Sequence, residues 1–92
     1  MVTAIVFIHT QVDAVNSVAE AVAAIEGVSE VYSVTGDLDL VALVRVHTLD
    51  DISGVVTDAI TAVPGIVNTQ THVAFRTYSR HDLETAFSLG LD

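Results

Sequence analysis

Two stretches of this sequence match each other: Ala4-Ile-Val-Phe-Ile-His-Thr-Gln-Val-Asp13 and, 38 residues later, Ala42-Leu-Val-Arg-Val-His-Thr-Leu-Asp-Asp51. The similarity extends to Gly27 in the first copy and to Gly65 in the second, with nine identical positions. A chain this rich in Val, Ala and Thr would give about two or three identities by chance. The sequence therefore contains two copies of one supersecondary unit.

Each copy is typical of a strand, a helix and a second strand. Residues 3–9 and 39–47 are rich in the β-branched and aliphatic side chains that favour strands. The Thr-x-x-Asp sequences at Thr10 and Thr48 indicate helix starts, because Thr accepts a hydrogen bond from a free N–H and Asp lies near the positive end of the helix dipole. Apolar residues at helical spacing follow, up to Gly27 and Gly65, which suit the left-handed conformation that ends a helix.

The remaining strands are predicted at residues 30–35 and 66–78, and Gly36-Asp37-Leu38 joins the two middle strands as a hairpin. The order βαββαβ predicts an α+β, ferredoxin-like fold, with a four-stranded antiparallel sheet and two helices on one face. The 92 residues suffice for one domain. Residues 79–92 have no counterpart in the repeat. Their apolar residues Leu83, Ala86 and Phe87 have helical spacing, which predicts an extra C-terminal helix.

The strands are apolar on both faces of the predicted sheet. The repeat makes the even positions of the first and third strands equivalent, and we assign them to the core beneath the helices. The odd positions still include Ile5, Phe7, Val41 and Leu43, whereas a solvated sheet face would carry polar residues. A second copy, packed sheet to sheet as in dimeric α/β barrels, is the simplest cover for this face. A chain this short would also be marginally stable as a monomer.

Charge and composition exclude several classes of partner. The net charge is −9, with three Arg and no Lys, so direct binding to nucleic acid or to an anionic membrane is not expected. We expect a soluble cytoplasmic protein, because no basic signal segment and no apolar run of membrane-spanning length is present. Without Cys or metal-ligand spacing of the four His residues, we expect no metal. Nothing resembles a nucleophile elbow, a Gly-rich phosphate loop or a dinucleotide-binding fingerprint, so we expect no cofactor and no catalytic residues.

The hairpin turn is the best candidate for a binding site. Gly36 allows unusual backbone conformations and a close approach of a ligand to the backbone. The turn amides can bind an anion, and the Asp39 carboxylate can accept hydrogen bonds from an ammonium group. This combination suits a zwitterion, although a plain glycine-containing turn would have the same sequence.

Three sequences in a fixed order resemble the C-terminal effector domain, or RAM domain, of the Lrp/AsnC transcriptional regulators. They are Val34-Thr-Gly-Asp-Leu-Asp-Leu40, Pro64-Gly-Ile66 and Thr69-Gln-Thr71, and the resemblance covers about residues 2 to 78. It implies dimers formed through the sheets, larger rings such as octamers, and amino acids or related metabolites bound between dimers. The ligand-binding residues that it implies are Gly36, Asp37, Leu38, Asp39, Thr69 and Thr71.

The resemblance also implies a regulatory role without direct DNA binding. The family's helix-turn-helix would precede this domain, but the first strand is already predicted to begin near Met1. We therefore expect a stand-alone effector-binding domain that modulates the regulation of amino acid metabolism. It would form homo-oligomers, and mixing with full-length Lrp/AsnC regulators through the same sheet contact is a further possibility.

Two other functions use the same fold. A small dimeric α/β-barrel enzyme, of the monooxygenase or isomerase type, would need an enclosed cavity with an inward-facing His or Asp. An ACT-type module also binds amino acids, but it pairs its subunits side by side instead of face to face. A purely structural assembly partner without a ligand is a third alternative.

Overall fold

The computed structural model describes residues 1–78 and residue 80. Its elements follow the predicted βαββαβ order, with a short helix and a π-helical segment together forming the second helical stretch. The predicted C-terminal helix in residues 79–92 lies, apart from residue 80, outside the described residues. The elements are β1 (Val2–Thr10), α1 (Val15–Ala23), β2 (Val28–Ser33), β3 (Leu40–Val46), α2 (Leu49–Ser53), η1 (Gly54–Ile60, π-helical) and β4 (Ile66–Ala74).

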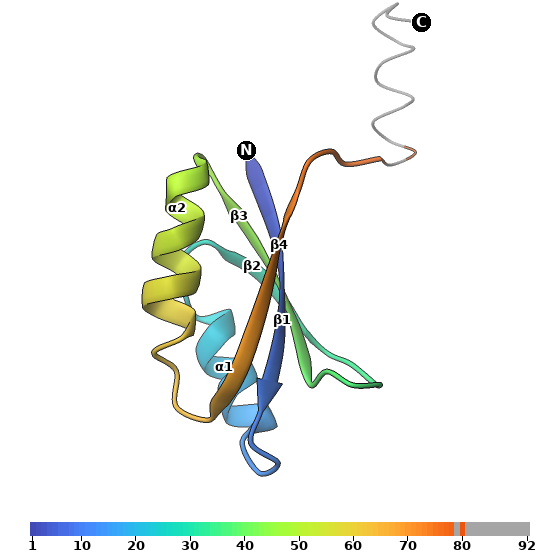
Figure 1. Ribbon diagram of the computed structural model, residues 1–92, viewed down its shortest axis with the longest axis vertical. Helices are drawn as coiled ribbons and strands as arrows, with labels where there is room; N and C mark the ends of the chain where they lie inside the picture. Colours follow the sequence, from blue (N-terminus) through green and yellow to red (C-terminus); the bar gives the residue numbers. More distant parts are fainter. Residues whose placement is uncertain (79, 81–92) are drawn as a thin grey trace, which may run out of the picture.

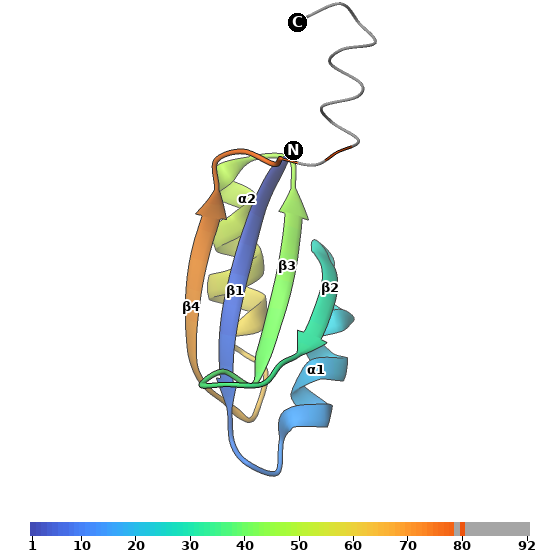
Figure 2. The ribbon, with the colours of Figure 1, turned by 90° about the vertical axis from the view of Figure 1, so that its right-hand side faces the viewer.

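The four strands form one antiparallel sheet in the order β2-β3-β1-β4. Both helical stretches pack on the same face, and the other face has no second layer in the described part of the chain (Figures 1 and 2). The two central strands, β1 and β3, are the ones that begin the two repeats. The ferredoxin-like fold predicted from the repeat is therefore confirmed.

The core lies between the sheet and the helices, and it is made of alternate strand residues. Every even-numbered residue from Ala4 to Ile8 and from Leu40 to Val44 is fully buried, as predicted from the repeat. Burying one Val, Leu or Ile side chain stabilises the fold by about 1.5–3 kcal/mol, so this alternation fixes the register of the central strands. The helices contribute Val18, Val22, Ile52 and Ile60 to the same cluster.

The two helix starts differ, although their sequences are alike. Thr48 caps α2 as predicted: its Oγ1 accepts a hydrogen bond from the Asp51 N–H at 3.3 Å, and Asp51 Oδ2 accepts one from the Thr48 N–H at 3.2 Å. The prediction for Thr10 was wrong, because Thr10 is the last residue of β1. The first helix begins at Val15, and its N-cap, Ala14, has no side chain that can cap it.

The helical stretches end before the predicted glycines, α1 at Ala23 and η1 at Ile60, but the two glycines have the predicted conformation. Gly27 and Gly65 have φ values of 98° and 96°, in the left-handed region. At Gly27 space is also restricted, because a Cβ atom would lie 2.8 Å from Val55 Cγ2. Both the backbone angle and the packing against η1 therefore require glycine at this position.

Candidate functional site

The turn between β2 and β3 projects from the side of the sheet opposite the helices (Figure 1). Figure 2 shows it crossing the end of β1 toward β4. Residues 34–37 are exposed, and Leu38 and Asp39 are half-buried. Gly36 has φ = 99°, and no atom lies within 4 Å of the position that a Cβ would take. The turn is thus open to solvent and can be approached closely at Gly36.

Asp39 anchors this turn to the central strand. Its Oδ2 accepts a hydrogen bond of 2.8 Å from the backbone N–H of Thr10, and its own N–H donates to the Ile8 carbonyl at 3.2 Å. Its carbonyl accepts from the Val34 N–H at 3.1 Å, which closes the base of the hairpin. Sequence reasoning treated Asp39 as an acceptor for a ligand. The structure shows that one of its carboxylate oxygens already has a backbone partner.

The turn presents a run of free backbone donors. Within the described residues, the amides of Thr35, Gly36, Asp37 and Leu38 donate no hydrogen bond. Consecutive N–H groups in a turn with one left-handed residue can form a concave site for an anion such as a carboxylate. The Asp37 side chain is exposed beside them and can accept from a cationic group.

The two threonines implied by the resemblance lie on the other side of the sheet. Thr69 pairs with Ile8 and Thr71 with Val6 across β1, so both share the face that the helices cover. Both are half-buried on the edge strand β4. Within one chain, the structure does not bring them together with the turn. A site that uses both groups needs a second copy of the chain.

The face opposite the helices, which we call the open face, has an apolar centre. Ile5, Phe7, Val41 and Leu43 occupy it and are only half-buried. On β4 the same face carries His72, whose ring centroid lies 5.0 Å from that of Phe7. An apolar centre with polar residues at its border is the usual composition of a protein interface.

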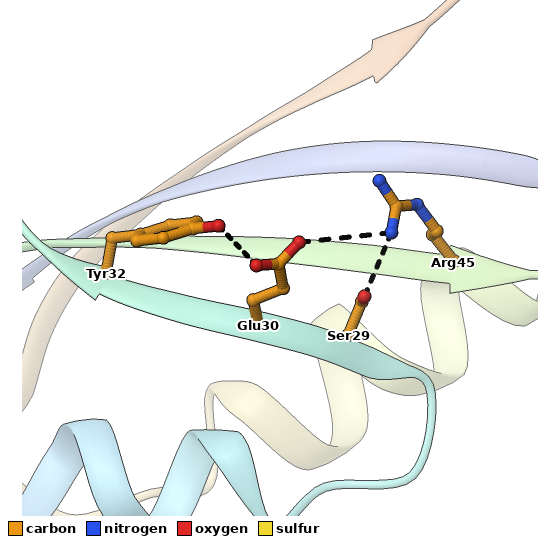
Figure 3. A network of polar contacts seen from close by, with 4 residues as sticks. All are labelled: Ser29, Glu30, Tyr32 and Arg45. Carbon is orange, nitrogen blue, oxygen red and sulfur yellow. Dashed lines mark hydrogen bonds and ion pairs between the residues drawn. The ribbon is translucent and has the colours of Figure 1, made fainter. Parts of the chain in front are cut away.

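A polar network borders the open face along β2 (Figure 3). The Tyr32 hydroxyl donates a hydrogen bond to Glu30, whose other oxygen lies 4.0 Å from Arg45 Nη1. The same Arg45 nitrogen donates to Ser29 Oγ at 3.0 Å. The hydrogen bond to Glu30 raises the pKa of Tyr32 above its ordinary value of 10.0; desolvation and the Glu30 charge act in the same direction, and Arg45 opposes them.

Sequence reasoning did not foresee a groove at the opposite end of the sheet. It has a volume of about 700 Å³ and lies between the loop after α1, the end of β3 and the α2–η1 stretch. Gly27 and Gly54 line it, and these two residues without a side chain were its only sequence signal. The charged or titratable side chains that line it are those of Glu26, Arg45, His47, Asp50 and Asp51. No buried side-chain polar atom in the described part of the chain lacks a partner.

The structure gives no sign of a metal site or a membrane span in the described part of the chain. Residues 1–78 and 80 contain no group of three or more His, Asp or Glu side chains placed to bind an ion. None of the helices among these residues has the length and apolarity needed to cross a bilayer.

Comparison with known proteins gives a consistent family assignment. The family model of the Lrp/AsnC ligand binding domain matches residues 3–83. The chain is 45% identical to TTHA0845 from Thermus thermophilus, with a TM-score of 0.82 over 87% of this chain and 100% of that protein. It is 33% identical to the hypothetical protein PHS023 from Pyrococcus horikoshii, with a TM-score of 0.77 over 88% of this chain and 98% of that one.

A longer regulator shares the fold. The transcriptional regulator NMB0573 from Neisseria meningitidis, solved as an L-Met complex, is 17% identical, with a TM-score of 0.76. The alignment covers 86% of this chain and 53% of the regulator, so the chain spans about half of that protein's length. No protein with a curated description matches the chain. The match over residues 3–83 shows that this chain belongs to the Lrp/AsnC ligand-binding domain family.

Proposed function

We propose that this chain is an effector-binding module that binds an amino acid, or a related small metabolite, between copies of itself. The observation that carries the proposal is the exposed turn at residues 34–39, with its free amides and an open approach to Gly36. The family assignment supports a regulatory role of this kind. The L-Met complex of the Neisseria regulator supports an amino acid as the ligand.

Each polar group of an amino acid has a counterpart in the proposed site. The amides of Gly36, Asp37 and Leu38 would hold the carboxylate. The Asp37 carboxylate and the remaining oxygen of Asp39 would accept from the ammonium group. Thr69 and Thr71 would contribute hydroxyl groups from a neighbouring copy, because they lie on the opposite side of the sheet in their own chain.

The open face supports assembly into homo-oligomers. A second copy packed sheet to sheet would remove Ile5, Phe7, Val41 and Leu43 from water. Dimers formed in this way would associate further, into rings such as octamers, with the ligand at the contacts between dimers. The same sheet contact would also accept a full-length Lrp/AsnC regulator.

The module would act in the cytoplasm, without catalysis and without contacting DNA itself. A net charge of −9, with no Lys, opposes binding to phosphate groups. The core favours a binding module over the barrel-enzyme alternative, since among the described residues its buried side chains are apolar apart from Thr10. A ligand that binds one assembly state more tightly than another would shift the equilibrium between them, which is the proposed regulatory output.

The test is a calorimetric titration of the oligomer with each of the twenty amino acids, followed by repetition of any hit with Asp37→Asn and Gly36→Ala. We expect at least one ligand with millimolar or tighter affinity, and a loss of at least tenfold in each variant. Leu49→Ser, on an exposed residue beyond the end of β3 opposite to the turn, is the matched control and should bind normally. Absence of any ligand, or variants that bind like the control, would contradict the proposal.

A further inference from the structure

The segment that follows β4 leaves the sheet on the side of the open face. In Figure 1 it runs from the end of β4 away from the helices. It carries two large apolar side chains in full contact with water, Phe75 at 100% exposure and Tyr78 at 79%. Exposed aromatic residues close to an uncovered apolar surface indicate a contact that is completed by another molecule.

The size of the open face indicates that the sheet alone is a small interface. Four strands about 4.8 Å apart, each contributing about seven residues of 3.4 Å, give a projected area of roughly 450 Å². A specific, stable interface buries about 800 Å² on each partner. The sheet face is therefore small for a stable interface, although its accessible area exceeds this projection, and exposed apolar side chains beside it would enlarge the contact.

The segment after β4 can enlarge this contact. A Phe or Tyr side chain buries about 150–250 Å², so Phe75 and Tyr78 would together add roughly 300–500 Å². Because Phe75 and Tyr78 are exposed in the single chain, their contact surface is not on their own sheet.

We propose that residues 75–78 form an arm that packs on a second copy of this chain and enlarges the sheet-to-sheet contact. This inference rests on the proposed assembly through the open face. In the dimer, each arm covers the border of the partner's open face, and the two contacts are equivalent by two-fold symmetry. Phe75 and Tyr78 are the anchors of the arm, since buried aromatic residues dominate the energetics of most interfaces.

The test measures the dissociation constant of the dimer by sedimentation equilibrium. We compare the wild type with Phe75→Ser/Tyr78→Ser and with a chain truncated after Ala74. The matched control is Val12→Ser/Leu49→Ser, which removes two exposed apolar side chains outside the arm and the open face. We expect the arm variants to weaken the dimer at least tenfold and the control to change it less than threefold. If the truncated chain does not fold, the double serine variant decides.

The outcomes separate the arm from the assembly on which it rests. A wild-type chain that stays monomeric at about 100 μM would overturn both the open-face dimer and the arm. If the wild type is a dimer and the arm variants have the same dissociation constant as the control, the proposed role of the arm is refuted and the open-face dimer is not. Variants that lower the unfolding stability of the monomer, without changing association, would show that the arm packs on its own chain and would also overturn the inference.

Discussion

Replacing Asp39 tests the structural half of the candidate site. Asp39→Ala removes the carboxylate that accepts the 2.8 Å hydrogen bond from the Thr10 N–H. The backbone N–H of the buried Thr10 then loses its acceptor. A hydrogen bond to a charged group stabilises a fold by about 1.5–3 kcal/mol, and the half-exposure of Asp39 places the effect in the lower part of this range. We therefore expect the free energy of unfolding to fall by about 1.5–2 kcal/mol.

The assay is urea denaturation followed by circular dichroism, at one fixed protein concentration because of the proposed assembly. Asp37→Ala is the matched control: it removes the same charge from the same turn, but Asp37 is exposed and makes no hydrogen bond or ion pair within the described residues. We expect this variant to stay within about 0.5 kcal/mol of the wild type. Equal effects of the two substitutions would refute the anchoring role of Asp39.

Two further predictions follow from the packing and the polar network. Gly36→Ala introduces only the strain of a left-handed alanine and should lower the free energy of unfolding by about 1–2 kcal/mol. Gly27→Ala has the same strain and also clashes with its neighbours, so it should lower the free energy of unfolding by at least about 1 kcal/mol more. Equal losses of stability in denaturant titrations would contradict the close packing at Gly27. In a Tyr78→Phe background, the absorbance of Tyr32 should titrate above pH 10.0, and Glu30→Gln should lower its midpoint. Since a raised pKa favours the protonated hydroxyl, the stabilisation from this bond is complete below pH 10.0 and is lost as the pH rises through the pKa of Tyr32.

The fold could be predicted because the repeat fixes several features at once. Matching two copies predicted the order of the elements and the core face of β1 and β3, and both are confirmed. Gly27 and Gly65 are left-handed as predicted, but the helical stretches end before they reach them. Thr10 shows where local reasoning stops. It has the same capping signal as Thr48, but its N–H binds the carboxylate of Asp39, which lies 29 residues away in the sequence. A local motif does not reveal such a long-range partner.

The candidate site was predictable only in part, for a related reason. The exposed turn and the left-handed Gly36 follow from local sequence, and the structure has both. The position of Thr69 and Thr71 depends on the register between β1 and β4, because the register determines which face of the sheet each residue occupies. This register contains a shift between His9 and Thr10. Motif spacing carries no information on that register, so it could not show that the threonines and the turn lie on opposite sides of one chain.

The molar mass of the wild-type protein in solution tests the central claim most directly. Sedimentation velocity or light scattering at micromolar concentration, with and without amino acids, would measure it. If the open face is covered by another copy, the mass is at least twice the 9.7 kDa of one chain, and a bound amino acid changes the distribution of assemblies. A stable 9.7 kDa particle that does not associate under either condition would contradict the account.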